Sequence, residues 1–101
     1  MINREYSDEI LQNVSEILGT LAHPLRLKII LHLSQEPSAV SDMINALNVR
    51  QPNLSQHLAL LKRLKILKTK REGRKILYFL AYPEIKDFII KTIEFFSTSK
   101  L

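Results

Sequence analysis

The sequence predicts an α+β fold that is mostly helical, with about five helices and one two-stranded β-hairpin. Apolar residues recur at the 3.6-residue period of an amphipathic helix in five segments, and after Leu64 the pattern changes to that of strands. A length of 101 residues, 46% of them apolar, suits one domain with one core. We therefore assign residues 1–101 to a single domain.

Two helices are expected in the first third of the chain. Residues 7–19 form the first, with Ser7 as its N-cap and with Asp8 and Glu9 in the first turn, where the helix dipole favours acids. The second helix begins at Pro24, a residue suited to the first helical position, and runs to about Ser34. The apolar stripe of the first helix consists of Ile10, Val14, Ile17, Leu18 and Leu21. The core positions of the second are Leu27, Ile30, Leu31 and Leu33.

The next segments predict a helix-turn-helix over residues 38–64. A short third helix opens at Ser38 or Ser41 and runs through Leu47, and residues 48–50 leave room only for a tight turn. Pro52 then marks the first turn of a longer fourth helix. The expected buried positions are Val40, Met43, Ile44 and Leu47 in the third helix and Leu54, Leu58, Leu61 and Leu64 in the fourth.

A basic β-hairpin, the wing, is expected at residues 66–81. Leu67–Arg71 and Lys75–Leu80 bracket Glu72-Gly73-Arg74, whose glycine supplies a positive φ. Pro83 opens a last helix with one apolar face, formed by Ile85, Phe88, Ile89, Ile93 and Phe96. A helix-turn-helix followed directly by such a hairpin is a winged helix-turn-helix.

Positive charge is concentrated in one part of the chain. The 15 Lys and Arg residues and 10 Asp and Glu residues give a net charge of +5. Residues 48–82 alone hold nine basic residues and one acid, a net charge of +8, so the remainder is slightly acidic. A charge run by itself is most often a solvated surface, but this concentration also indicates a polyanionic partner.

Several classes of function are excluded by what the sequence lacks. Without cysteine there are no disulfides, thiolate metal sites, cysteine nucleophiles or thiol switches. Gly19 and Gly73 are too far apart to form a phosphate-binding loop, and no HExxH or GxSxG motif occurs. We expect no enzymatic activity, no catalytic residue and no cofactor. No uncharged apolar run approaches the ~20 residues of a membrane span, and the first ten residues hold no apolar signal core, so a cytoplasmic protein is expected.

The chemistry of the fourth helix indicates double-stranded DNA as the partner. Its first two turns hold polar side chains where a recognition helix meets base edges, and Gln and Asn amides pair bidentately with adenine. Basic residues at the helix end and on the wing can contact phosphates on either side of the groove. The expected DNA-binding residues are Arg50, Gln51, Asn53, Ser55, Gln56, His57, Lys62, Lys68, Lys70, Arg71, Arg74 and Lys75.

The chain resembles the ArsR/SmtB family of bacterial winged-helix repressors over about residues 17–96. The segments that carry the resemblance are HPLRLKIILHL (23–33), AVSDMINAL (39–47), QPNLSQHLALLKRLKIL (51–67) and KREGRKILYFL (70–80). The resemblance implies a homodimer on an operator with twofold symmetry, formed through the helices at 7–21 and 83–98. Its interface residues would be Ile10, Val14, Ile17, Phe88, Ile89, Ile93 and Phe96. Alternatively, the two apolar stripes complete the core of a monomer.

Three features depart from the family pattern. Arg50 stands where the family commonly has a Ser or Thr cap, which is worth roughly 1 kcal/mol; arginine could reach a phosphate instead. The family's thiol pair would fall at Ala39 and Ser41, which supply no thiolate. Its carboxylate/histidine site would fall near Tyr82, Glu84, Phe95 and Thr98, which leave at most one ligand. We therefore expect no metal site.

The three histidines are interpreted without a metal. His23 caps or flanks the second helix, His32 and Glu36 form a solvated i,i+4 pair, and His57 packs or contacts the DNA backbone. Two ligands do not make a structural zinc site.

The predicted function is that of a sequence-specific DNA-binding transcriptional regulator, a repressor acting as a homodimer without metal or thiol sensing. Its control is left open between abundance alone and an apolar or anionic small molecule bound at the dimer interface or between helices. Two competing functions are those of a winged helix that binds protein and of one that binds RNA. RNA binding is disfavoured because the basic face is poor in stacking aromatic residues apart from Tyr78.

Overall fold

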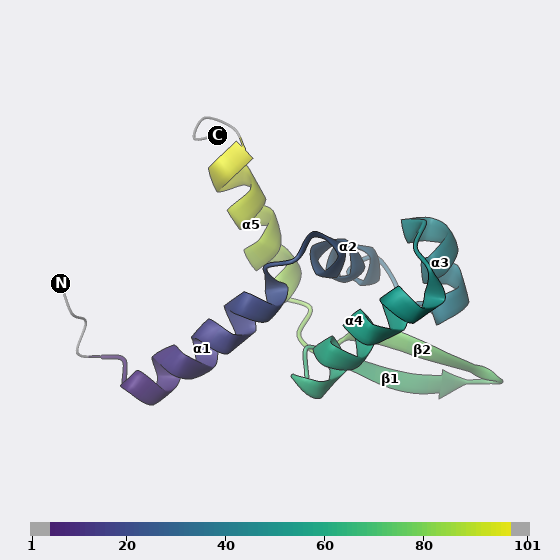
Figure 1. Cartoon of the computed structure of the whole chain (residues 1–101), viewed down its shortest axis with the longest axis horizontal. Helices are drawn as coiled ribbons and strands as arrows, with labels where there is room; N and C mark the ends of the chain where they lie inside the picture. Colours follow the sequence, from purple (N-terminus) through teal and green to yellow (C-terminus); the bar gives the residue numbers. More distant parts are fainter. Residues whose placement is uncertain (1–4, 98–101) are drawn as a thin grey trace.

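The computed structural model describes residues 5–97, which form five helices and one β-hairpin (Figure 1). In chain order these are α1 (Asp8–Leu21), α2 (Pro24–Leu33), α3 (Val40–Leu47), α4 (Gln51–Arg63), β1 (Leu67–Glu72), β2 (Lys75–Leu80) and α5 (Ile85–Ser97). The two strands pair antiparallel, with Leu67 opposite Leu80 and Glu72 opposite Lys75. The mostly helical α+β fold with a helix-turn-helix and a wing is confirmed.

Helix α2 is the centre of the molecule, because it packs against α1, α3, α4, α5 and β2. Ile29 and Ile30 on α2 are fully buried, as are Met43 on α3 and Leu54, Leu58 and Leu61 on α4. Leu67 and Leu80 close the core at the base of the wing, where they face each other across the two strands. The core therefore fixes the helix-turn-helix and the wing relative to one another.

Helices α1 and α5 extend away from this core in different directions (Figure 1). The Cα radius of gyration is 15.4 Å, whereas a compact chain of this length has a value of about 13 Å. The two projecting helices account for the difference and leave much of their apolar surface uncovered. No helix among residues 5–97 is long and apolar enough to cross a membrane.

The first helix begins as predicted. Ser7 has extended φ and ψ values of −73° and 161°, and its side chain accepts a hydrogen bond from the Ile10 backbone N–H at 3.1 Å. The acids Asp8 and Glu9 follow in the first turn. His23 caps α2 in the same way, accepting at Nδ1 from the Leu25 N–H at 3.1 Å, as expected for a capping histidine.

The prediction that Ser38 or Ser41 caps the third helix is wrong. Ala39 occupies the N-cap position of α3, and no side chain caps the helix. Ser38 is instead buried and pairs with the wing, donating its N–H to the Tyr78 carbonyl at 3.1 Å and accepting from the Tyr78 N–H at 2.8 Å. Ser38, which the local pattern favours as a helix cap, is thus engaged in a long-range backbone pairing with Tyr78 instead.

One other boundary and part of the core differ from expectation. Helix α5 begins at Ile85 rather than Pro83, because the preceding turn closes with a hydrogen bond from the Ile85 N–H to the Tyr82 carbonyl. The expected end of this helix at Thr98 lies outside the described residues. On α2, Leu25 and Ile29 are buried in addition to Ile30 and Leu33, whereas Leu27 and Leu31 are only partly buried. Val40, Ile44, Leu47 and Leu64, all expected to be buried, are also only partly buried.

Candidate nucleic-acid interface

The first half of α4 presents polar side chains to solvent. Leu54, Leu58 and Leu61 are each 0% exposed and face the core. Because the helix buries this one stripe, the residues between lie on its outer surface. Of the residues predicted to contact DNA on this helix, those exposed in its first half are Gln51, Asn53, Ser55 and Gln56. The structure therefore brings together a row of amide and hydroxyl groups of the kind that reads base edges.

The turn before α4 gives this helix its separation from α3. Asn48 ends α3 in the left-handed conformation, with φ 52° and ψ 56°, and its backbone N–H donates to the Ile44 carbonyl. Asparagine tolerates this conformation better than most residues do. The chain then reverses within residues 48–50, and α3 packs against α4. This is the predicted helix-turn-helix.

Arg50 occupies the N-cap of α4 without capping it. Its backbone has the extended conformation of an N-cap, with φ −82° and ψ 144°, but no side chain accepts the N–H groups of the first turn. The first turn also contains no acid. The start of α4 thus keeps its positive dipole end and unpaired N–H groups beside an exposed guanidinium, an arrangement that favours an anion.

The wing carries its basic side chains on both faces. Side chains alternate along a strand, so the observed register puts Lys68, Lys70 and Lys75 on one face and Arg71 on the other. Lys70 Nζ lies 5.7 Å from the centroid of the Phe79 ring on the neighbouring strand. Gly73 has φ 63° in the two-residue turn, as predicted, and Arg74 stands beside it at the tip. All five basic residues are exposed.

A backbone bridge holds the wing against the helix-turn-helix. The Ser38–Tyr78 pair described above joins β2 to the segment that precedes α3. The Ser38 side chain also contacts His32, with 3.0 Å between Oγ and Nε2. Because this contact reaches α2, the wing is connected to α2 and α3 at one point. No local sequence pattern signals this bridge, because its two residues are 40 positions apart.

His57 is the one predicted DNA-binding residue that is not fully exposed. Its Nδ1 accepts a hydrogen bond from Arg26 Nε at 3.0 Å, and its ring lies 4.5 Å from the His23 ring, centroid to centroid. Burial lowers the pKa of His57 below the ordinary histidine value, and the nearby His23 and Arg26 lower it further. His57 is therefore a neutral packing residue near neutral pH, with only its Nε2 left for another partner.

Basic residues also gather where α4 meets the wing. Lys62, Lys65 and Lys68 line a shallow depression of about 520 Å³, together with Leu67, Thr69 and Tyr82. Lys65 has φ 63°, an uncommon value for a residue other than glycine. Lys65 counted toward the basic run but was not among the predicted DNA-binding residues, because its place beside Lys62 and Lys68 depends on this sharp turn.

The terminal helices expose most of the residues predicted to form a dimer interface. Those exposed are Ile10, Val14 and Ile17 on α1 and Phe88, Ile93 and Phe96 on α5, each between 40% and 50%. Ile89 is only 3% exposed and belongs to the core of the single chain. Its assignment to the interface is corrected: α5 packs this side of itself against α2.

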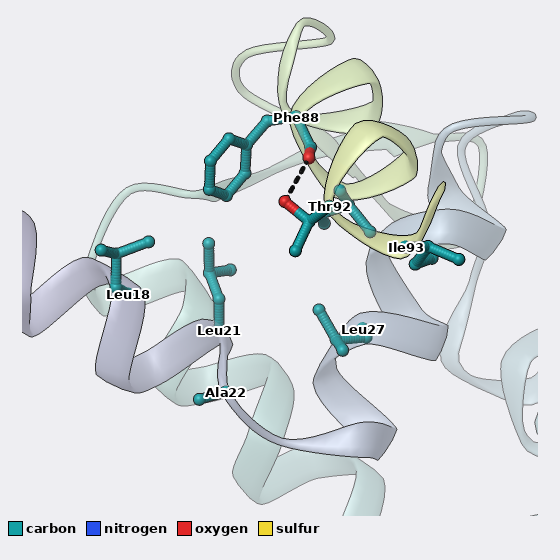
Figure 2. A pocket seen from close by; sticks show the side chains of 8 residues that line it. Leu18, Leu21, Ala22, Leu27, Phe88, Thr92 and Ile93 are labelled. Carbon is teal, nitrogen blue, oxygen red and sulfur yellow. Dashed lines mark hydrogen bonds between the residues drawn. The ribbon is translucent and has the colours of Figure 1, made fainter. Parts of the chain in front are cut away.

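An apolar pocket of about 210 Å³ lies between α1, α2 and α5 (Figure 2). Figure 2 shows the side chains of Leu18 and Leu21 from α1, Leu27 from α2 and Phe88 from α5 around this space. The one hydroxyl there, that of Thr92, already donates to the Phe88 carbonyl at 2.8 Å. The lining thus offers packing surface and no unpaired polar side chain.

Within residues 5–97, no three or more histidine, aspartate or glutamate side chains are grouped closely enough to hold a metal ion. His32 contacts Ser38, so the expected His32–Glu36 pair is replaced by this contact. Tyr82, Glu84 and Phe95 are exposed, and Thr98 lies outside the described residues.

Comparisons with known proteins agree on one family. A family model described as "Helix-turn-helix domain" matches residues 21–70. The HTH-type transcriptional repressor SmtB of Mycobacterium tuberculosis is 36% identical over 85 residues, which are 84% of this chain and 63% of that protein. The transcriptional repressor PagR of Bacillus anthracis is 38% identical over 80 residues, 78% of this chain and 80% of PagR. This chain thus spans less than two thirds of the length of SmtB.

A solved structure extends the agreement to the whole fold. The transcriptional repressor BigR of Xylella fastidiosa superposes with a TM-score of 0.81 at 26% identity, covering 97% of this chain and 100% of that one. The helix-turn-helix, the wing and the two terminal helices are all included in that coverage. With this fold, this surface and these relatives, the chain belongs to the ArsR/SmtB family of winged-helix transcriptional regulators.

Proposed function

We propose that this protein is a transcriptional repressor that binds a specific sequence of double-stranded DNA. The observation that carries the proposal is the exposed polar row on α4, flanked by a basic wing that the Ser38–Tyr78 bridge holds in place. The α4 amides would read bases in the major groove, and the wing would contact phosphate. The proposed contact residues are Arg50, Gln51, Asn53, Ser55, Gln56, Lys62, Lys68, Lys70, Arg71, Arg74 and Lys75, with His57 behind them and Lys65 added.

Selection of bound sequences from random duplex DNA tests this function directly. We expect one recurring sequence, bound with an affinity that falls as salt rises, because phosphate contacts release counterions. On that sequence, Gln56→Ala should cost about 1–3 kcal/mol and relax the preference at one position. Salt-insensitive binding, or binding to no duplex, would refute the proposal.

The protein acts on that sequence as a homodimer, in this proposal, through the exposed apolar faces of α1 and α5. Six apolar side chains that are 40% to 50% exposed on two projecting helices support this, because a single chain leaves them in water. A symmetric dimer would place its half-sites about 34–36 Å apart. Sedimentation at micromolar concentration tests the dimer, and a monomer there would contradict it.

The regulation proposed here uses neither metal nor thiol, and the protein has no catalytic activity. The support is the chemistry of the chain: it has no cysteine, and its described histidines contact Leu25, Arg26 and Ser38. Its place of action would be the cytoplasm, where the operator DNA is. Tight stoichiometric zinc binding that shifts operator affinity would contradict the absence of metal sensing.

A response to an apolar small molecule is the second candidate, and the pocket of Figure 2 is the observation that favours it. Its volume of about 210 Å³ exceeds that of an engineered apolar cavity of about 150 Å³ known to bind benzene. The test is operator release on addition of benzene-sized aromatic compounds, compared between the native chain and Ala22→Phe, which adds a large side chain at a position that lines the pocket. Release that is identical in both proteins would exclude this pocket as the site.

A further inference from the structure

One arginine joins the corner between α1 and α2 to the middle of α4. Arg26, on α2, donates from Nε to His57 Nδ1 at 3.0 Å and from Nη1 to the Thr20 carbonyl at 2.9 Å. Thr20 lies near the end of α1, and His57 is on α4, 31 residues from Arg26 in the sequence. A single side chain thus connects three helices, including the one with the exposed polar row.

The chemistry of each partner suits arginine. The last carbonyls of a helix have no partner within the helix and form its negative dipole end, so a guanidinium beside Thr20 satisfies both. The guanidinium also holds its donors in a fixed planar arrangement, so it can reach the carbonyl and the imidazole together. Lysine has a flexible stem and a compact ammonium group, and it would not hold both partners in this geometry.

The bond to Arg26 determines which nitrogen of His57 carries the proton. Arginine only donates, so Nδ1 must be unprotonated and the N–H must be on Nε2. A second proton, on Nδ1 of His57, would place an N–H donor and a positive charge next to the positively charged guanidinium of Arg26, which itself only donates. The charged and titratable groups that face His57 are Arg26 and His23, both beside it from α2 and its N-cap, and neither would stabilise an imidazolium. The contact therefore requires neutral His57.

We propose that Arg26 is a positioning residue for operator recognition: through His57 it holds the recognition helix at a set orientation against the α1–α2 corner. This inference rests on the proposed DNA-binding function. His57 directly follows Gln56 on α4, so a small rotation of the helix moves the base-reading side chains. The wing is held separately, by the Ser38–Tyr78 bridge. Loss of the Arg26 contact should therefore affect sequence reading more than phosphate binding.

The test compares Arg26→Met with Lys28→Met, a basic position on the same helix that forms none of these contacts. Affinities are measured for the duplex obtained by selection and for a random duplex, over a range of salt. For Arg26→Met we expect about a tenfold loss on the selected duplex, the size of one hydrogen bond to a charged group. The random duplex and the salt slope should stay unchanged, and Lys28→Met should match the native chain on the selected duplex.

Two outcomes with Arg26→Met would overturn this positioning role. Equal losses on both duplexes would mean that Arg26 only stabilises the fold, and a salt slope smaller by about 1 would mean that Arg26 contacts a phosphate. Arg26→Lys covers the case in which Arg26→Met does not fold. Arg26→Lys keeps the charge but not the geometry that contacts both partners, so we expect a smaller loss of affinity, again confined to the selected duplex. A native-like ratio of selected-duplex to random-duplex affinity would refute the proposal.

Acidification gives an independent readout. Because the pKa of His57 lies below the ordinary imidazole value of about 6.5, the ratio of selected-duplex to random-duplex affinity should stay constant from about pH 8 to about pH 6.5 and fall for the native chain as the pH drops further. In His57→Asn, the amide oxygen takes the place of Nδ1, accepts from Arg26 and does not titrate, so the ratio should stay flat. Identical pH profiles for the two proteins would contradict the role of His57.

The results also distinguish failure of the positioning role of Arg26 from failure of the proposed DNA-binding function. A native chain that binds no duplex overturns both. If the native chain discriminates between the two duplexes and Arg26→Met discriminates equally well, only the positioning role is overturned. The DNA-binding function is then still supported.

Discussion

Replacing Arg50 with serine should make the protein more stable and a weaker DNA binder. Arg50 already has the backbone of an N-cap, with φ −82° and ψ 144°, but its side chain forms no capping hydrogen bond. Ser7 shows what serine does in almost the same conformation: its side chain accepts from the N–H three residues later at 3.1 Å. Serine at position 50 can accept from the Asn53 N–H in the same way, which is worth about 1 kcal/mol.

Arg50→Ser should also weaken DNA binding. If Arg50 contacts a phosphate, Arg50→Ser should reduce the slope of log affinity against log salt by about 0.9. Urea unfolding measures the stability and a salt titration on the selected duplex measures the slope, with Lys28→Ser as the basic control away from α4. An unchanged midpoint in urea would refute the capping argument, and an unchanged salt slope would refute the phosphate contact.

Burial and charge lead to three further predictions. Ile93→Glu places a charge on a side chain that is 44% exposed, so circular dichroism should stay native while sedimentation shows a monomer; a stable dimer would contradict the assigned interface. Leu58→Ala truncates a side chain that is 0% exposed, so urea unfolding should show a free energy of unfolding lower by about 2–5 kcal/mol. A loss below about 1 kcal/mol would contradict this, because it would mean that neighbouring core side chains move in and fill the space left by the leucine. Because the folded-state pKa of His57 is lowered, the unfolded chain binds more protons there, so stability should fall as pH drops through about 6.5 and level off below the folded-state pKa; His57→Asn should show a smaller decline, and an equal decline would assign the effect to other groups.

The elements and the recognition helix could be predicted because their signals are local. Ser7 and Pro24 mark helix starts, Gly73 marks the turn of the wing, and the leucines of α4 recur at helical spacing, so each can be recognised from a few neighbouring residues. Burial of that leucine stripe then leaves the polar residues of the first two turns outside. The exposed row on α4 follows from the same pattern.

The predictions from sequence failed where a distant part of the chain determines the hydrogen bonding or burial of a residue. Ser38 has the chemistry of a cap, but its backbone pairs with Tyr78. Ile89 belongs to the apolar stripe of α5, but that helix turns this residue toward α2 and leaves its neighbour Phe88 exposed. For His57, which was expected either to pack or to contact the DNA backbone, the packing partners Arg26 and His23 likewise come from a distant part of the chain, α2 and its N-cap. None of these partners lies within one turn or one hairpin of the residue it affects.

The sequence by itself determined the order of the elements, the location of the positive charge and the absence of thiol chemistry, because composition and periodicity do not depend on how helices pack. Only the tertiary structure decided which apolar residues are left for a partner, what anchors the wing and which groups surround His57. The physical reason is that burial and hydrogen bonding are properties of pairs of surfaces. In this chain the decisive pairs, Ser38 with Tyr78 and Arg26 with His57, join residues that are 40 and 31 positions apart.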